Sequence, residues 1–493
     1  MGNAAAVDGR LFDAPVGERD EPVVRGRVDK TFRVYDPDQM FLMPPSIADW
    51  VPEDHLARFV SELIDEVVDL EPFLAVHTER RGFPPYDPRL MLKLLVYGYT
   101  TGVRSSRRIE KCCHDDVAFR FLAANQAPDF RSVARFRRRH LAALDALFLE
   151  ILKLCQQAGM VKLGRVGLDG SKVRANASRR KAMSYKRMTE READLQAEVD
   201  DLLADAEATD TAEDDQFGSD GRDDDLDAEM ARRESRLAKI RRAKADLEAD
   251  AARRAAADAA RKTWHRTAGA DDVTAEQRHE DTATAADEAA TEAPVADKAQ
   301  RNFTDPDSRI MKTSDGSFHY CYNAQTAADE ANQVIVATRL SNRSADCPEF
   351  VSLLDEVIAN CGAAPDQVVA DAGYFSEDNV AAAAQRNVDA LIATGRLKHD
   401  EKPAAAPRGR IPNNATVKQR MARKLRTKPG RDAYARRKAI IEPVFGQIDT
   451  VQGGKQVLLR GEQAADHEWQ FIAACHNVRK LFNYTTAARP APT

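Results

Sequence analysis

Short apolar strands alternate with amphipathic helices in the C-terminal part of this 493-residue chain, and this alternation constrains its fold more tightly than any other feature. The pattern predicts strands at 317–327, 332–340, 366–371 and 389–394, and helices at 347–362 and 376–387. Such an alternation indicates a sheet covered by helices, with crossovers that join parallel neighbours. The short apolar strand that ends at Asp169, within "MVKLGRVGLDG", belongs naturally to the same sheet.

A charged, alanine-rich segment separates that strand from the later ones. Residues 191–300 contain 16 Lys or Arg and 31 Asp or Glu, a net charge of −15 in a chain whose total is −6, so the remainder carries +9. Outside the acidic segment the protein is therefore net basic, and a basic surface attracts phosphate backbones. We expect two helices in an antiparallel hairpin or coiled arm, with disordered flanks at 211–227 and 268–300 because these lack apolar residues to bury.

The N-terminal third has a helical pattern. Residues 1–45 show little apolar periodicity and are expected to form an extended arm, whereas 46–160 predict four packed helices. The last helix, expected at 129–159, begins with a cluster of arginines: Arg131, Arg135, Arg137, Arg138 and Arg139. A solvated helix face and a DNA-contacting helix both explain this cluster. A short helix pair before a basic helix suits a helix-turn-helix, which favours DNA binding by this region.

Cysteine usage and hydropathy argue against several classes of protein. The seven cysteines are scattered and include no Cys-x-x-Cys pair, which argues against a disulfide framework and a zinc ribbon. No stretch approaches the roughly 20 apolar residues that span a bilayer, and the N-terminus lacks the pattern of a signal peptide. We therefore expect a cytoplasmic protein with no membrane partner.

Two aspartates are candidate catalytic groups at strand ends. Asp169 precedes Gly170, and Asp-Gly often makes a tight hairpin turn, but helix-forming sequence follows here instead of a matching strand. Asp371 likewise ends an apolar strand, in "QVVAD", and a turn or helix cap is the competing explanation. Ligand sites in open α/β sheets collect beyond the carboxyl ends of strands, so the two aspartates can meet if their strands are neighbours.

A third acid, Glu442, lies in the predicted helix "AYARRKAIIEPVFGQIDTV", among apolar residues that should pack on the core. A buried carboxylate needs a partner, either a salt bridge to Arg437 or Lys438 or a cation shared with the two aspartates. The stretch 396–440 contains 15 Lys or Arg and only three acids, which favours a polyanionic phosphate substrate. Phosphodiester chemistry can use two divalent ions, and carboxylates suit Mg²⁺, with Mn²⁺ as an alternative.

Five motifs in order resemble those of the DDE transposases of bacterial insertion sequences, in the group with a Tyr-Arg-Glu signature: "GLDGSKVRANAS", "NFTDPDSRIMKT", "YNAQTA", "VVADAGYFSE" and "YARRKAIIEPVFGQI". The resemblance covers about 35–485. It implies a ribonuclease-H-like catalytic domain in which Asp169, Asp371 and Glu442 are the catalytic residues and bind two Mg²⁺ ions.

The resemblance also implies that Tyr434 and Arg437 support Glu442 or contact DNA. The chain departs from the family pattern at two places. Four residues rather than three separate Arg437 from Glu442, so Lys438 is an alternative for the role of the arginine. Asp449 stands where the family usually has a lysine, which affects the expected contacts to the terminal nucleotide.

Together these features predict an all-α DNA-binding domain at 46–160, an inserted acidic helical arm at 181–300, and an α/β ribonuclease-H-like catalytic domain at 161–180 and 301–485. The candidate DNA-binding residues are Arg131, Arg135, Arg138, Arg139, Tyr434, Arg437 and Lys438. The expected function is a transposase that binds the ends of its insertion sequence as a homodimer, cleaves double-stranded DNA with Mg²⁺ and transfers the freed strand to target DNA. A structure-selective nuclease of the same fold and an inactive, transposase-derived DNA-binding regulator stay open. The expected location is the nucleoid in the bacterial cytoplasm.

Overall fold

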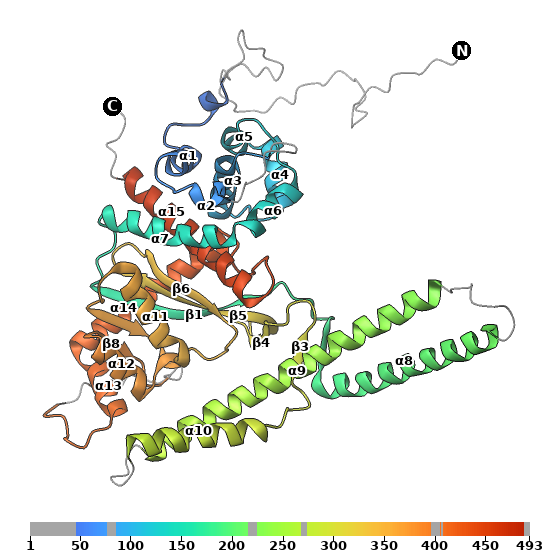
Figure 1. Ribbon diagram of the computed structural model, residues 1–493. Coiled ribbons are helices and arrows are strands. Elements are labelled where there is room, and N and C mark those ends of the chain that lie inside the picture. The colour runs from blue at the N-terminus through green and yellow to red at the C-terminus, as the bar shows by residue number, and fades with distance from the viewer. Residues whose placement is uncertain are drawn as a thin grey trace, which may run out of the picture. The chain divides into compact units, whose positions relative to one another are not determined.

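The computed structural model describes residues 46–75, 85–214, 224–267, 274–395, 405 and 408–487. The predicted extended arm at 1–45 lies outside the described residues, as does the middle of the predicted flank at 211–227. Within the described part, the chain is a mixed α/β protein with a mostly helical N-terminal region (Figure 1). No helix in this part is both long and apolar enough to cross a membrane.

The central sheet has six strands in the order β4-β5-β1-β7-β8, with β6 also paired to β5. Their bounds are β1 Arg165–Arg174, β4 Arg309–Lys312, β5 Phe318–Asp329, β6 Ile335–Ser341, β7 Gln367–Ala370 and β8 Asp389–Ile392. Strand β5 pairs antiparallel with β1, β4 and β6, whereas β1, β7 and β8 run parallel. The four strands predicted after residue 301 are confirmed, and the strand that contains Asp169 joins their sheet as expected.

Helices connect and cover the parallel strands. The connections are η2 Cys347–Glu349 and α11 Phe350–Cys361 before β7, and η3 Ala372–Tyr374 and α12 Glu377–Gln385 before β8. Gly362, in the left-handed conformation, ends α11, and Ser376 caps α12 by accepting a hydrogen bond from the Asn379 N–H. Two further helices follow β8, namely α13 Val417–Arg426 and α14 Lys428–Thr450. Because α14 packs across β1, β5 and β7, it places its side chains against the middle of the sheet.

The helical N-terminal region precedes β1. Its elements are η1 Ile47–Trp50, α1 Leu56–Glu66, α2 Glu71–Leu74, α3 Pro88–Thr101, α4 Ser106–Asp115, α5 Val117–Leu122, α6 Phe130–Arg139 and α7 Leu141–Gln157. The single helix predicted at 129–159 is wrong, because it is split into α6 and α7 at His140, where φ is −110° and ψ is 27°. The buried His140 ring packs against Phe73 and Phe136 at this break, a contact that periodicity along the chain does not reveal.

One hydrophobic core extends through the helical region and the sheet. Helices α3 and α7 pack on the C-terminal helix α15 Glu462–Ala487, and α15 packs in turn on β6. Trp469, Phe471 and Ile472 of α15 are buried in this core. Segments from both ends of the chain therefore stabilise the same unit.

The inserted arm contains three helices and a short ladder at its root (Figure 1). The helices are α8 Tyr185–Asp214, α9 Asp224–Thr267 and α10 Ala275–Thr291, and the ladder pairs β2 Ala182–Ser184 with β3 Gln300–Asn302. Both α8 and α10 pack on α9. The predicted helical hairpin is confirmed, but the disorder predicted at 268–300 is wrong for α10, which begins with a capping box between Thr274 and Gln277. Alanine is the strongest helix former, so this alanine-rich stretch folds against α9 with few large apolar side chains.

Candidate active site

Asp169 lies within β1 rather than at its end. The strand continues through Gly170 to Arg174, and β5 pairs with it from Val166 to Arg174. Continuing this ladder satisfies the backbone hydrogen-bonding groups that a turn would release. The Asp-Gly turn that the sequence left open does not form, and the expectation that the strand ends at Asp169 is wrong.

Gly170 is required by close packing instead. A Cβ atom at this position would lie 2.6 Å from Asp346 Oδ1 and 2.6 Å from Gln325 Nε2. Both separations are shorter than Cβ contacts in folded proteins. Any side chain larger than hydrogen would therefore displace one of these two polar groups from β1.

Asp371 lies beside Asp169 in the sheet. Strands β1 and β7 are parallel neighbours, and Leu168 pairs with Ala370, so an aspartate comes next on each strand. Asp371 follows the end of β7, and its Oδ1 accepts a 2.7 Å hydrogen bond from the Gly373 N–H, which caps the short η3 turn. The structure thus brings two of the three predicted acids together, which meets the condition, stated from the sequence, that their strands be neighbours.

Helix α14 presents a cation to Asp169. Arg437 Nη1 donates to Asp169 Oδ2 at 2.9 Å, and both side chains are largely buried. Burial raises the pKa of Asp169, the charge of Arg437 opposes this shift, and the charge of Asp371 adds to it. Tyr434, one turn earlier on the helix, is partly buried and interacts electrostatically with Arg437 and Asp371. Arg437 therefore contacts an acid, but that acid is Asp169 and not Glu442.

Glu442 is exposed on α14, so its predicted burial is wrong. The buried positions that follow Arg437 on the helix are Ile440, Ile441, Val444 and Ile448. A helix rotates about 100° per residue, which turns Glu442 away from this face. Lys438 is also exposed, and within the described part of the chain Glu442 forms no salt bridge with it or with Arg437. The catalytic role of Glu442 stays a prediction.

Helix α14 continues through Pro443, directly after Glu442. A proline has no N–H to donate to the carbonyl four residues earlier, which is that of Ala439. The Gln333 Nε2 group donates to the Ala439 carbonyl at 2.8 Å instead. The side chain next to β6 thereby supplies the hydrogen bond that the helix cannot make.

Asp346 is a candidate that the sequence reasoning missed. It precedes η2, and its Oδ1 accepts hydrogen bonds from Asn323 Nδ2 at 2.7 Å, Gln325 Nε2 at 2.8 Å and Lys172 Nζ at 3.2 Å. A Cβ atom on Gly373 would lie 3.0 Å from Asp346 Oδ2 and 2.9 Å from Asp371 Oδ1. No short motif marks Asp346, because its partners come from β1 and β5, which are far from it in sequence.

Asp346 and Asp169 lie on opposite faces of β1. Side chains alternate along a strand, so Asp169 faces α14, whereas Gly170 and Lys172 face Asp346. Asp346 therefore does not join Asp169 in one ligand cluster. It packs against the turn that carries Asp371 from the other side of the sheet.

Asp169 and Asp371 have the chemistry that a divalent cation requires. Carboxylate oxygens are the donors that Mg²⁺ prefers, and the two charges act on each other. Among the residues that the structure describes, no three acidic, histidine or cysteine side chains are close enough to hold one metal ion. The predicted triad is therefore represented by an adjacent pair of aspartates, with the exposed Glu442 outside it.

The four α6 arginines predicted to bind DNA are exposed: Arg131, Arg135, Arg138 and Arg139. The fifth arginine of the cluster, Arg137, is buried and donates to the Tyr99 hydroxyl at 2.9 Å, so the expectation that it faces solvent is wrong. Helix α4 packs against α6 and adds exposed Arg107 and Arg108, which the sequence reasoning did not single out. These side chains form a basic surface over two neighbouring helices.

Asp449, at the position where the family has a lysine, is partly buried on α14. Burial raises the pKa of Asp449, and the charge of Lys455 opposes the shift. The Lys455 carbonyl accepts a 2.9 Å hydrogen bond from the Arg174 N–H, so this lysine is held beside the end of β1. A lysine is therefore within electrostatic range of Asp449, and it comes from the segment directly after α14.

Comparison with protein families gives two matches. Residues 45–139 match the family described as "Transposase domain (DUF772)", and residues 278–478 match the family described as "Transposase DDE domain". The second match includes Asp371 and Glu442, whereas Asp169 lies between the two matched ranges. Neither the curated proteins nor the solved structures yield a match.

Proposed function

This chain belongs to the DDE transposases of insertion sequences, and from that premise we propose that it binds the ends of its own element, cleaves DNA there and joins the freed strand to target DNA. The observation that supports this proposal best is the adjacency of Asp169 and Asp371 on parallel strands, with Arg437 beside them. A basic helical surface on α4 and α6 supplies a complementary surface for a phosphate backbone.

In this proposal Asp169 and Asp371 hold Mg²⁺ or Mn²⁺, and Glu442 is the third carboxylate that the family resemblance implies. Two such ions, when bound, activate the attacking oxygen and stabilise the leaving oxygen of a phosphodiester. Arg437 holds the Asp169 carboxylate in place through its 2.9 Å bond and offsets the repulsion between the aspartates. Tyr434 packs next to Arg437 and limits its movement.

We assign DNA recognition to the exposed arginines of α6 and to α14. The proposed DNA-binding residues are Arg131, Arg135, Arg138, Arg139, Tyr434, Arg437 and Lys438. Joining requires two element ends at one place, so we propose a homodimer on double-stranded DNA. The substrate places this activity at the nucleoid, in the bacterial cytoplasm.

Strand cleavage and joining by the purified full chain tests the proposal. The DNA carries the sequences that flank the reading frame, and products are separated on denaturing gels with and without Mg²⁺. We expect Asp169→Asn and Asp371→Asn each to lower the cleavage rate by about a thousandfold or more, because each removes a metal-binding charge. Asp378→Asn, at an exposed position on α12, is the control and should match the wild type. Wild-type rates in both site variants would refute the assignment.

A DNA-binding regulator without catalysis is the second candidate. It is favoured by the exposed Glu442, by the absence of a three-ligand metal group among the described residues, and by Asp449 in place of a lysine. Duplex binding that is independent of Mg²⁺, with no cleavage, would establish this alternative. Cleavage without joined products would instead identify a nuclease.

A further inference from the structure

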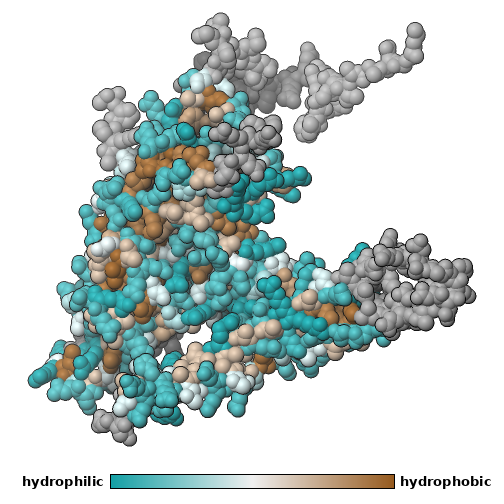
Figure 2. Space-filling model, viewed as in Figure 1, coloured by the Kyte–Doolittle hydropathy of each residue, from teal (hydrophilic) through white to brown (hydrophobic). Residues whose placement is uncertain are grey.

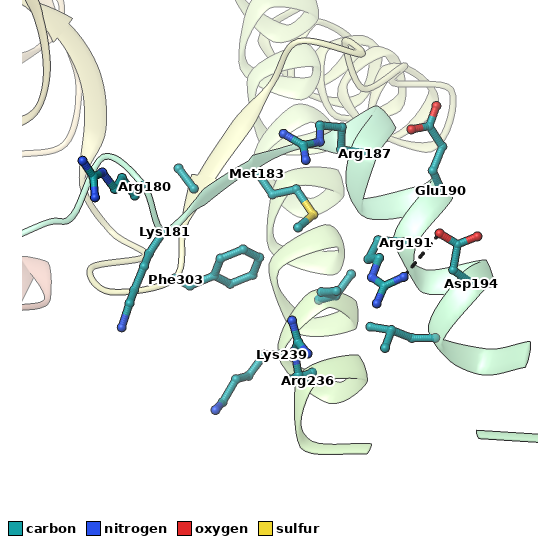
Figure 3. A pocket seen from close by; sticks show the side chains of 13 residues that line it. Arg180, Lys181, Met183, Arg187, Glu190, Arg191, Asp194, Arg236, Lys239 and Phe303 are labelled. Atoms are coloured by element: carbon teal, nitrogen blue, oxygen red, sulfur yellow. Dashed lines mark ion pairs between the residues drawn. The ribbon is translucent and has the colours of Figure 1, made fainter. Parts of the chain in front are cut away.

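A pocket lies at the root of the inserted arm, outside the aspartate pair. We call it the arm-root pocket; it has a volume of about 610 Å³ and lies between α8, α9 and the β2–β3 ladder (Figure 3). Six basic side chains line it: Arg180, Lys181, Arg187, Arg191, Arg236 and Lys239. Its apolar lining includes Met183, Leu195, Ile240 and Phe303. The pocket therefore has an apolar lining with a positively charged rim, by which we mean its six basic side chains.

The positive charge of this rim is largely uncompensated. Two acids line the pocket, Glu190 and Asp194, and Asp194 is 3.5 Å from Arg191, with which it pairs. Arg191 also pairs with Glu198 at 3.2 Å. For the other five bases, no ion pair forms with any residue that the structure describes. They consequently keep their charge available to a ligand.

Two basic residues that follow on α9 form ion pairs with α8. Arg241 and Lys244 follow the pocket residues on the same helix, and Glu192 of α8 pairs with both, at 3.0 and 3.1 Å. These pairs hold α8 to α9. Arg241 and Lys244 are thereby neutralised, whereas Arg236 and Lys239 of the pocket form no ion pair with a described residue.

Hydrogen bonds connect the surroundings of the pocket to the strands at the arm root. The Phe303 N–H donates to the Lys181 carbonyl at 2.8 Å, next to the β2–β3 ladder. Asp250 of α9 accepts hydrogen bonds from Arg301 at 2.8 Å and from Arg309, in β4, at 2.7 Å. A ligand in the arm-root pocket would thus be held in a defined position relative to β1 and β5.

We propose that the arm-root pocket binds the phosphate backbone of duplex DNA. The inference rests on the proposed function, in which duplex DNA is the substrate, and adds a contact surface beyond the helical region and α14. Figure 3 shows that the bases come from different sides of the pocket, with Arg180 and Lys181 apart from Arg236 and Lys239. This spread suits an extended polyanion better than a single small phosphate.

The charge distribution along the arm favours the same ligand. The segment 191–300 carries −15 in total, and its visible surface is mainly hydrophilic (Figure 2), whereas the lining of the arm-root pocket contains six bases and two acids. The pocket lining therefore attracts phosphates although the segment as a whole is acidic.

Duplex binding by the full chain tests the inference, with a linear DNA that lacks element sequence as the probe and no divalent cation present. The variant Arg236→Gln/Lys239→Gln removes two rim charges from α9. The variant Arg254→Gln/Lys262→Gln removes the same two residue types from exposed positions of the same helix, roughly 30 Å further along its axis, and is the control. Fluorescence anisotropy over a series of salt concentrations gives the affinity and its salt dependence.

We expect the rim variant to bind about tenfold more weakly at physiological salt and to lower the slope of log K against log salt by up to about 2, since each phosphate contact contributes about 0.9. The control should stay within about twofold of the wild type. Equal losses in both variants, or wild-type binding by the rim variant, would overturn the inference. The proposed function is judged separately, by cleavage and joining with wild-type protein.

Discussion

Asp346 belongs to a hydrogen-bond network on the face of the sheet opposite to Asp169. The buried Tyr374 hydroxyl donates to Gln325 Oε1, and the amide nitrogen of Gln325 donates to Asp346. Burial, followed by the charges of Asp346, Asp169 and Asp371, raises the pKa of Tyr374 well above its ordinary value. We therefore expect Asp346 to act as a positioning residue, because it lies against the turn that carries Asp371.

Replacement of Asp346 tests this role. Asp346→Ala leaves the donors of Lys172, Asn323 and Gln325 unpaired, and we expect DNA cleavage to fall by about 10- to 100-fold, as for other residues that orient metal ligands. Asp346→Asn keeps an oxygen that accepts these bonds and should restore most of the rate. A purely structural role predicts that DNA binding and the thermal midpoint fall in parallel with cleavage, whereas positioning leaves the DNA affinity unchanged.

Glu356, on α11, predicts a pH dependence of stability. Burial raises its pKa to about 7, against the charge of Arg339 at 3.2 Å and with support from Asp466 and Glu349. The folded state therefore binds more protons than the unfolded state between its ordinary pKa of 4.5 and about 7, so the free energy of unfolding decreases as the pH rises through this range. Glu356→Gln should raise the thermal midpoint at pH above 7 and leave it unchanged near pH 4.5. Calorimetry at several pH values measures the thermal midpoint of each protein, with the exposed Glu377→Gln variant as the control. If the thermal midpoints of the wild type and Glu356→Gln changed in parallel with pH, the prediction would be contradicted.

Residue positions within the site were only partly predictable. The sequence identified Asp169 and Asp371 as acids at apolar strands that can meet if those strands are neighbours, but strand periodicity alone does not determine the order of strands in a sheet. It could not place Glu442, because the rotation of α14 about its axis depends on which apolar side chains pack on β1. Asp346 could not be identified as a site residue for a related reason, since its partners lie on strands that are distant from it in the chain.

At the scale of elements, the arm is attached by a cluster of charges. Asp250 of α9 pairs with Arg301 and Arg309, and all three side chains are mostly buried. Asp246 adds a 3.3 Å contact to Arg301. Since Arg301 and Arg309 flank the return of the chain to the sheet, this cluster ties α9 to β3 and β4.

Loss of Asp250 should loosen the arm without unfolding the sheet. Asp250→Ala leaves two partly buried guanidinium groups without this carboxylate, which costs about 3 kcal/mol in comparable buried pairs. We expect tryptic cleavage at the arm root to become at least tenfold faster, because the variant populates the locally open form of the root more often and trypsin cleaves that form. Asp258→Ala, which removes an exposed partner of Arg261, is the matched control on α9. Equal cleavage rates in the two variants would show that the cluster does not hold the arm.

Helices and strands were predicted correctly where a single helical or strand periodicity continued over the whole element. The strands and the helices α11 and α12 follow from alternation and caps within short windows. The break at His140 did not, because the apolar stripe of α7 continues the pattern of α6 while tertiary contacts of an aromatic ring decide the bend. Helix α10 was missed because composition alone suggested disorder, whereas helix propensity and a neighbouring helix were sufficient to order it.

At the scale of the whole molecule, a buried network joins the helical region to the C-terminal helix. Glu468 of α15 accepts hydrogen bonds from the Tyr99 hydroxyl at 3.0 Å and from the Leu458 and Leu459 N–H groups at 2.7 and 2.9 Å. Arg104 lies 3.5 Å away on the same carboxylate. The two parts that match separate families therefore share a buried network of charged side chains.

Removal of the Glu468 carboxylate should lower the stability of the helical region and of the sheet together. Glu468→Ala leaves Arg104 buried without its partner, and we expect a loss of about 3–5 kcal/mol in the free energy of unfolding. Urea unfolding followed by circular dichroism should show one transition at a lower midpoint. Exposed Asp432→Ala on α14 serves as the control. Two separate transitions in the variant, with only one of them shifted, would mean that the helical region and the sheet are independent.

The ladder at the arm root also bears on how the chain folds. The Tyr185 N–H donates to the Ala299 carbonyl at 2.8 Å, so the two ends of the arm meet directly beside β2 and β3. The entropy of closing a loop grows with the number of mobile residues in it, and an arm that folds on its own removes most of them. Once the arm has folded, the mobile loop between the antiparallel strands β1 and β5 is much shorter than their separation in sequence. We therefore expect a change in the length of the arm beyond this ladder to leave the register of β1 and β5 unaltered.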